Sequence, residues 1–360
     1  MVYAYSHLFA FLITILLLVG LRPLAFHFNL IDRPGGRKTH HGNIPLIGGI
    51  AMFGGFIAFS LVHHNEVMNL LPMLTGLSIV LFIGLLDDVH DLSTKVRFFA
   101  QITAALVMIY GGGIVLNDLG HLINSETLVL GSITVPFTVF CVVGVTNAMN
   151  ISDGMDGLGG GLALVALLAM ISLVLNTGRV EILSILLALA TTVTAFMAFN
   201  MRTPWRSHAK VFMGSAGSMS LGFILAWFMV NLSQGEQRVM EPVTAIWIFA
   251  LPLLDTVSVM LRRILKGRSP FAPDREHFHH ILLVAGYSVN QSVFIMLTIA
   301  LVLAIVGVAG HYTHVPEAIL FYAFLGLSAV YFWSMHHAWK VMKSIRLEKQ
   351  NSSPNQRKAA

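Results

Sequence analysis

Five carboxylates occur in two short motifs, and each motif directly follows an apolar segment. The first motif is Asp87-Asp88-Val-His-Asp91, and the second is Asn150-Ile-Ser-Asp153-Gly-Met-Asp156-Gly. Neighbouring carboxylates repel one another unless a cation or a basic group neutralises them. Carboxylate oxygens suit Mg²⁺ or Mn²⁺, which can also bridge the phosphates of a substrate. The motifs are therefore candidates for metal-dependent chemistry, with a solvated helix end and an Asp-Gly turn as the plain alternatives.

A third motif, His277-Phe-His279-His280, follows a basic stretch of the chain. The basic residues of this stretch are Arg262, Arg263, Lys266, Arg268 and Arg275. Arg and Lys neutralise phosphate oxygens, and His donates hydrogen bonds or moves protons near neutral pH. The combination predicts a diphosphate-binding loop. A zinc site is the rival interpretation, although no Glu is placed as in a His-Glu-x-x-His motif, and lipid headgroup contact explains Arg262 and Arg263 without any substrate.

Two further features leave alternatives open. The stretch 32–49 mixes turn-forming residues with cations, so it either binds phosphate through Arg37, Lys38 or a histidine, or only makes a tight turn. Asp255 lies inside an apolar segment, where an ionisable residue is a functional candidate. Pairing with Arg262 or Arg263 as a structural clamp is the favoured alternative for Asp255.

Composition identifies the class of protein that must position these groups. The chain has 56% hydrophobic and 11% charged residues, against about 25% charged residues in soluble domains. Its mean hydropathy is +0.77. These values predict a polytopic membrane protein, and no Lys/Arg-rich run on a soluble domain suggests nucleic-acid binding. The one cysteine, Cys141, excludes a disulfide framework and Cys-ligated zinc.

Eleven apolar stretches are long enough to cross a hydrocarbon core of about 30 Å. They run near 6–27, 44–62, 68–86, 98–116, 128–149, 160–176, 180–200, 214–232, 242–260, 292–312 and 317–337. A single segment that crosses lipid must satisfy all of its backbone hydrogen bonds internally, and only a helix does so. The expected fold class is therefore an all-α polytopic membrane protein with about eleven transmembrane helices.

The distribution of charge predicts the orientation of the chain. All Lys and Arg residues except Arg179 and Arg238 fall on one side of the eleven stretches. The positive-inside rule places that side in the cytoplasm, with the N-terminus outside and the C-terminus inside. Residues 1–340 are expected to form a single membrane domain with cytoplasmic active-site loops, and residues 341–360 a polar cytoplasmic tail.

The ordered motifs resemble those of the polyprenyl-phosphate N-acetylhexosamine-1-phosphate transferases. The matching stretches are Asp87-Asp88-x-x-Asp91, Asn150-x-x-Asp153-Gly-x-Asp156-Gly, Phe212-Met-Gly-x-Ala-Gly-Ser218 and His277-x-His279-His280. The resemblance covers nearly the whole chain. Within this family, Pro45-Leu-Ile-Gly-Gly49 and Ser269-Pro-Phe-Ala-Pro-Asp-Arg275 are most similar to members that act on undecaprenyl phosphate and UDP-N-acetylglucosamine.

The resemblance implies attack by undecaprenyl phosphate on the β-phosphorus of UDP-N-acetylglucosamine, which releases UMP and leaves a lipid diphosphate sugar. This is the first membrane step of a surface glycan pathway. The resemblance also implies a multi-pass protein of the bacterial cytoplasmic (inner) membrane, an active site facing the cytoplasm and a Mg²⁺ or Mn²⁺ cofactor. The expected partners are the two substrates and the lipid bilayer, with no nucleic acid; a homodimer is left open.

The family also implies roles for individual residues. Asp87 and Asp88 match an acidic pair assigned to metal binding or to deprotonation of the lipid phosphate. Asp153 and Asp156 match the loop at the reaction centre, and His277, His279 and His280 match a histidine motif near the diphosphate. The expected nucleotide-sugar residues are Lys95, Asn150, Asn200 and Arg275.

Ser215 departs from the family pattern, which has Asp at this position as a magnesium ligand. A serine hydroxyl is neutral and is a poorer Mg²⁺ ligand, and loss of one preorganised electrostatic group commonly costs on the order of 10²- to 10³-fold in rate. The chain is therefore a weakened enzyme, an altered copy of an active one, or an inactive relative that binds nucleotide sugar or lipid. A proton-coupled transporter is less favoured, because carriers place charges near the bilayer midplane and have repeated halves.

Overall fold

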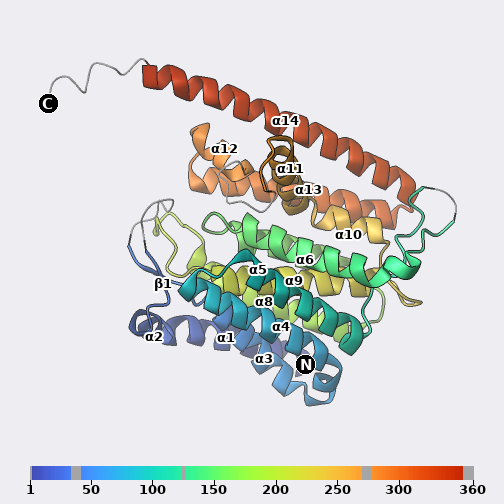
Figure 1. The fold of residues 1–360 in the computed structure, drawn as a ribbon. Coiled ribbons are helices and arrows are strands. Elements are labelled where there is room, and N and C mark those ends of the chain that lie inside the picture. Colours follow the sequence, from blue (N-terminus) through green and yellow to red (C-terminus); the bar gives the residue numbers. More distant parts are fainter. Residues whose placement is uncertain (1, 34–41, 124–125, 270–276, 352–360) are drawn as a thin grey trace.

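The computed structural model describes residues 2–33, 42–123, 126–269 and 277–351, and most of this chain is helical (Figure 1). The first half contains α1 (Val2–Gly20), α2 (Arg22–His27), α3 (Gly48–Val62), α4 (His64–His90), α5 (Thr94–Leu106), the π-helix η1 (Val107–Gly111), the 3-10 helix η2 (Gly131–Ile133), α6 (Thr134–Ser152) and α7 (Leu158–Val174). The second half contains α8 (Val180–Asn200), α9 (Gly214–Ser233), α10 (Pro242–Ile248), α11 (Ala250–Leu265), α12 (Phe278–Val284), α13 (Val289–Tyr312) and α14 (Glu317–Asn351). The predicted all-α membrane class is confirmed.

Among the described residues, seven helical segments are long and apolar enough to cross a membrane, or eight if one bent pair is a single span. The seven are Tyr5–His27, Leu70–His90, Gly131–Ser152, Val180–Asn200, Gly214–Ser233, Val289–Tyr312 and Glu317–Trp339. The expected number of eleven full-length helices is not confirmed. The difference arises because α3 and α7 have only 15 and 17 residues, which rise about 22–26 Å, and because α5 changes into the π-helix η1.

The bent pair is α10 and α11, which meet at an angle of 81°. The sequence predicted one helix over 242–260, but Pro252 lies two residues into α11 and α10 ends at Ile248. A proline ring clashes with the carbonyl four residues earlier, which here belongs to Ile248. The bend turns α11, with Asp255, away from the direction of α10.

Helix α9 forms the centre of the molecule. Nearly all of its residues are buried, and it packs against α3, α4, α6, α7 and α10. In Figure 1, α1 and α3 lie at the bottom of the molecule and α14 lies at the top. Helix α14 packs against α10, α11 and α12, and it continues to Asn351, so the expected boundary at residue 340 falls inside a helix.

A short hairpin joins the first expected cytoplasmic loop to the start of α9. Strands β1 (Ile31–Asp32) and β2 (Ile44–Pro45) pair antiparallel. The Pro45 carbonyl accepts from Phe212 N at 2.9 Å, and Phe212 O accepts from Gly48 N at 3.0 Å. Residues 34–41 of this loop, including Arg37 and Lys38, lie outside the described residues. In Figure 1, β1 and α12 lie at the same end of the molecule, on the left.

Candidate active site

Asp88 binds the N-terminus of α9. Its Oδ1 accepts from Ser215 N at 2.7 Å, and its Oδ2 accepts from Ala216 N at 3.2 Å. Gly214 has φ 72°, and a Cβ at this position would lie 2.4 Å from Asp88 Oδ2. Glycine is therefore required for the helix to approach the carboxylate, and the N–H groups at the N-terminus of α9 satisfy both carboxylate oxygens.

Asp87, the neighbouring carboxylate, has different partners. Its Oδ1 accepts from Leu92 N at 2.9 Å, and its Oδ2 accepts from Arg97 Nη1 at 3.1 Å. The Asp87 side chain is only 5% exposed. Because Arg97 neutralises Asp87, the acidic pair divides into one carboxylate in an ion pair and one carboxylate at a helix N-terminus.

The loop between α6 and α7 brings two more carboxylates to the same place. Burial, and then the nearby carboxylates of Asp156 and Asp88, raise the pKa of Asp153 to about 7, although a hydrogen bond from Gly159 N opposes this shift. Asp156 accepts from Arg202 Nε at 2.7 Å and from Ala209 N at 3.2 Å. Asp153 therefore lies among carboxylates, whereas Asp156 has a cationic partner.

The buried side chain of Asn200 binds the backbone of this loop. Its Oδ1 accepts from Gly157 N at 2.7 Å, and its Nδ2 donates to Val211 O at 2.9 Å. The residue is only 4% exposed. Both ends of the amide thus bind the backbone, so the structure gives Asn200 a supporting position under the loop, while the sequence predicted a contact with the nucleotide.

The histidine motif packs on this loop through His279. A Cβ at Gly154 would lie 2.6 Å from His279 Nε2, so only glycine permits the contact. Burial, and then the neighbouring His280, lower the pKa of His279 to about 3, which keeps its ring neutral near neutral pH. Within the described chain, His279 Nδ1 is buried without a hydrogen-bond partner.

His277 pairs with Asp255, a partner that the sequence did not suggest. The His277 Nδ1 atom lies 2.9 Å from Asp255 Oδ2. The ring of His277 also stacks on that of His279, with centroids 5.9 Å apart and an interplanar angle of 5°. The bend between α10 and α11 and the start of α12 thus place a carboxylate against the histidine motif.

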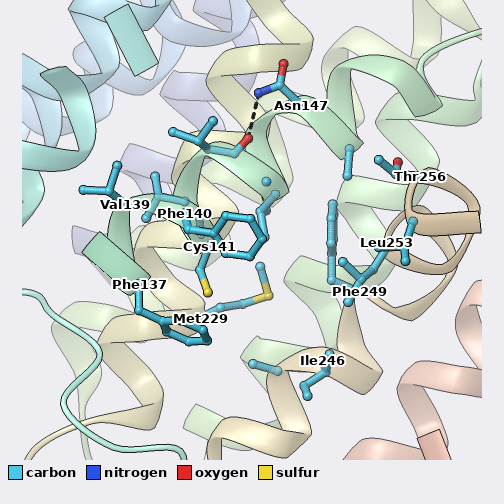
Figure 2. Close-up of a pocket in the computed structure, with 18 of the residues that line it drawn as sticks. Phe137, Val139, Phe140, Cys141, Asn147, Met229, Ile246, Phe249, Leu253 and Thr256 are labelled. Carbon is cyan, nitrogen blue, oxygen red and sulfur yellow. Dashed lines mark hydrogen bonds between the residues drawn. The ribbon is translucent and has the colours of Figure 1, made fainter. Parts of the chain in front are cut away.

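A large cavity of about 1180 Å³ begins at the histidines and runs along α6, α9, α10 and α11. Its apolar part is lined by side chains such as Phe137, Phe140, Met229, Phe249 and Leu253 (Figure 2). Its polar end holds Arg97, Asn150, Gly154, Arg263, His277, His279 and His280. An apolar cavity with cations and imidazoles at one end suits an amphipathic ligand with an anionic head.

The carboxylates fit a divalent ion only together with a substrate. Among the described residues, no group of three or more His, Cys, Asp or Glu side chains is arranged to hold a metal ion. Mg²⁺, however, is usually bound by one or two carboxylates plus substrate phosphates. Asp88 and Asp153 interact electrostatically, and such crowded carboxylates favour a cation. Asp87 fits less well, because Arg97 already binds it.

Of the remaining predicted nucleotide-sugar residues, one lines the cavity, one is exposed on a helix and one is not described. Asn150 Oδ1 accepts from the Ser218 hydroxyl at 2.7 Å, and Asn150 lines the cavity. Lys95 is exposed in the first turn of α5. Arg275 lies outside the described residues. Sequence alone assigned no site role to Arg97 or Arg202, which bind Asp87 and Asp156. Arg97 could have been found as the cation ten residues after Asp87, on the other side of a helix end.

The family is defined by comparison with known proteins. Residues 70–233 match the model of glycosyl transferase family 4. A relative from Yersinia pestis is 36% identical over 340 residues, 94% of this chain and 93% of the relative. A relative from Haemophilus influenzae is 37% identical over 342 residues, 95% and 96% of the two chains. One from Escherichia coli K12 is 36% identical over 347 residues, 96% and 94%.

Each of these relatives is named undecaprenyl-phosphate alpha-N-acetylglucosaminyl 1-phosphate transferase. Fold, site and relatives together define a membrane-embedded transferase enzyme. The chain belongs to glycosyl transferase family 4, among relatives that share more than a third of its residues over nearly the full length of both chains. The family expected from the motifs is confirmed.

Proposed function

We propose that this protein transfers N-acetylglucosamine 1-phosphate from UDP-N-acetylglucosamine to undecaprenyl phosphate, giving UMP and a lipid diphosphate sugar. The names of the relatives support this reaction. The observation that most strongly supports this reaction is a single cavity that has an apolar part and a polar end. Its apolar part suits a polyprenyl chain, and its polar end is lined by the histidine motif and by Gly154, which follows Asp153 in the loop of carboxylates.

In this proposal the lipid acceptor lies in the cavity with its phosphate at the polar end. Arg97, Arg263 and His280 lie there to bind phosphate oxygens. An oxygen of the acceptor phosphate bonds to the β-phosphorus of the donor, the bond from that phosphorus to the oxygen bridging to UMP breaks, and UMP leaves with the electron pair. Phosphoryl transfer depends mainly on positioning and charge neutralisation, which these side chains provide.

Asp88 and Asp153 are the residues that would hold Mg²⁺ or Mn²⁺ together with the donor diphosphate. When bound, the ion supplies charge neutralisation on the diphosphate. Burial, and then the neighbouring carboxylates of Asp156 and Asp88, raise the pKa of Asp153, and a bound cation would neutralise this crowded carboxylate. Asn200 and Arg202 hold the loop that presents Asp153 and Asp156 to the diphosphate.

The membrane arrangement that we infer keeps eleven crossings. The short helices α3 and α7, α5 with η1, and the bent pair α10–α11 complete the seven long spans. From the positive-inside rule we infer that the active-site loops and the C-terminus face the cytoplasm of a bacterial cell. The product is a membrane-bound sugar that serves as the first unit of a surface glycan.

One experiment separates this reaction from its alternatives. Purified protein in liposomes is incubated with Mg²⁺, undecaprenyl phosphate and UDP-N-acetylglucosamine carrying label in the sugar. Transfer of the label into organic-extractable lipid, with release of UMP, is the expected result, and UDP-N-acetylgalactosamine in parallel tests the choice of sugar. Binding of the label without transfer would identify the inactive relative suggested by Ser215, and passage into the liposome without chemistry would identify a carrier.

A further inference from the structure

The Asp255 carboxylate accepts hydrogen bonds from two helices besides its own. It is only 3% exposed on α11. Its Oδ2 lies 2.9 Å from His277 Nδ1, and its Oδ1 accepts from Phe278 N at 3.0 Å and from the Tyr331 hydroxyl at 3.1 Å. A buried carboxylate with three donors is fixed in orientation, and it fixes those donors in turn.

These contacts determine which nitrogen of His277 remains for a ligand. An ionised carboxylate only accepts hydrogen bonds, so His277 Nδ1 must carry the proton. Nε2 is then the nitrogen with a free lone pair in the neutral ring. Stacking on His279 holds the plane of the ring, and His277 lines the polar end of the cavity.

We propose that Asp255 is a positioning residue that keeps His277 in its Nδ1–H form, so that His277 Nε2 takes the proton from the acceptor phosphate. This inference rests on the proposed function. A phosphate monoester loses its second proton near pH 6, so part of the bound acceptor carries one P–OH group. The proton moves to Nε2, the freed oxygen bonds to the β-phosphorus of the donor, and Asp255 stabilises the imidazolium that results.

The charged and titratable groups around this pair come from three helices. They are Arg262 and Arg263 on α11, His279 and His280 on α12, and Tyr331 on α14. His279 stays neutral near neutral pH, so the histidine motif has two different tasks: His279 packs against the loop at Gly154, and His277 exchanges the proton.

Asp255→Asn tests this role while it preserves the shape of the site. Phe278 N can only donate, so the Asn carbonyl must stay on that side and the Asn NH₂ must face His277. Two donors would then meet, and His277 moves its proton to Nε2 to accept from the amide. The bonds to Phe278 and Tyr331 remain, but Nε2 can no longer receive a proton from the substrate.

The expected result is a loss of rate that depends on pH. At a pH below the second pKa of the acceptor phosphate, kcat of Asp255→Asn falls by about 10²-fold or more. At alkaline pH the acceptor is already a dianion, so the difference from the parent shrinks, and KM for UDP-N-acetylglucosamine stays near the parent value. In a His277→Ala background, Asp255→Asn should cause no further loss.

Tyr331→Phe is the matched control. It removes one hydrogen bond from the same carboxylate but leaves His277 bound to Asp255, so it should keep the rate and pH profile of the parent. A second measurement does not depend on activity: ¹⁵N spectra of labelled histidine should show His277 as the Nδ1–H tautomer in the parent and as the Nε2–H tautomer in Asp255→Asn.

Equal losses in Asp255→Asn and Tyr331→Phe at every pH, or an Nε2–H tautomer in the parent, would overturn the inference while parental transfer of label upholds the proposed function. Absence of transfer by the parent at every pH and Mg²⁺ concentration would instead overturn the proposed function, and the proton transfer to His277 with it.

Discussion

Ser215 N donates a hydrogen bond of 2.7 Å to Asp88 Oδ1, which joins the end of α4 to the start of α9 at the centre of the site. The residue that departs from the family pattern is therefore in direct contact with Asp88, which in the proposed function would hold the metal. An aspartate at position 215 would add a further carboxylate next to Asp88, which already interacts with Asp87 and Asp153.

The first prediction is that Ser215→Asp raises metal-dependent transfer. The added carboxylate supplies a charged ligand, and one such electrostatic group is worth on the order of 10²- to 10³-fold in rate. Transfer of labelled sugar phosphate to undecaprenyl phosphate, measured across a Mg²⁺ titration, checks this. Ser215→Asn is the control, since it adds similar volume without charge and should give no gain. Equal turnover of Ser215→Asp and the parent would show that position 215 does not contact the metal.

The second prediction is that Asp88→Asn abolishes transfer. Asp88 uses both oxygens to accept from Ser215 N and Ala216 N, and an amide can accept on only one side while its NH₂ group meets the other donor. The charge that would bind Mg²⁺ is lost as well. Asp91→Asn is the matched control three residues away, because Asp91 is exposed with φ 50°, a conformation that Asn tolerates. Transfer by Asp88→Asn at the rate of Asp91→Asn would remove Asp88 from the mechanism.

The motifs that the sequence singled out come together in the structure, but the sequence did not predict the partner of each residue. The acidic and histidine motifs could be found because ionisable side chains are costly where an apolar segment ends, and because the motifs share one side of the chain with nearly all Lys and Arg residues. Asp87 and Asp88 could not be told apart, because adjacent helical residues point about 100° apart and their partners lie ten and 127 residues away. Pairs such as Asp255 and His277 depend on how three helices pack, which residue types alone do not determine.

Helix lengths were likewise overestimated where apolar residues continue past a break. The apolar pattern before Gly48 belongs to β2, so α3 begins later than predicted. The break after Ile248 follows from Pro252. Pro252 can be read in the sequence, but the long apolar stretch around it favoured a single continuous helix. Hydropathy measures whether a segment can lie in lipid, and it does not measure where the backbone changes direction.

The third prediction concerns stability and pH. The pKa of Asp153 is raised from its ordinary value of 3.8 to about 7, so between these values the folded protein holds a proton that the unfolded chain releases. Stability therefore falls as pH rises through this window, and the loss remains above it. Asp153→Asn removes the ionisation, so it should melt at a higher temperature than the parent at alkaline pH, while the difference fades in acid.

Thermal unfolding in detergent over this pH range checks the third prediction, and Asp91→Asn serves as the exposed carboxylate control. Because a bound cation favours ionised Asp153, Mg²⁺ with UDP-N-acetylglucosamine should narrow the gap between the parent and Asp153→Asn. Identical melting temperatures at alkaline pH would mean that Asp153 is already ionised at no cost. Asp153→Asn should also lose transfer activity, which would make this a position where function is maintained at the expense of stability.

The fourth prediction distinguishes two roles for Asn200. If Asn200 holds the loop, Asn200→Ala leaves Gly157 N and Val211 O without their partners, and unsatisfied buried groups of this kind cost about 1–3 kcal/mol each. The variant should then lose thermal stability and kcat, with little change in KM for UDP-N-acetylglucosamine. A rise in KM for the donor at unchanged stability would support the direct nucleotide contact expected from the sequence.

The last prediction tests the lipid site. Gly144 on α6 lines the cavity, and a Cβ at this position would meet no atom within 4 Å. Gly144→Trp should fold and should occupy space that the polyprenyl chain needs. Since each buried methylene contributes about 0.8 kcal/mol, displacement of a few of them raises KM for undecaprenyl phosphate by roughly 10-fold or more, while KM for UDP-N-acetylglucosamine stays unchanged. Gly326→Trp is the control, because Gly326 on α14 also has no neighbour within 4 Å of an added Cβ and does not line the cavity. Parental KM values for both substrates in Gly144→Trp would show that the acceptor chain does not run along α6.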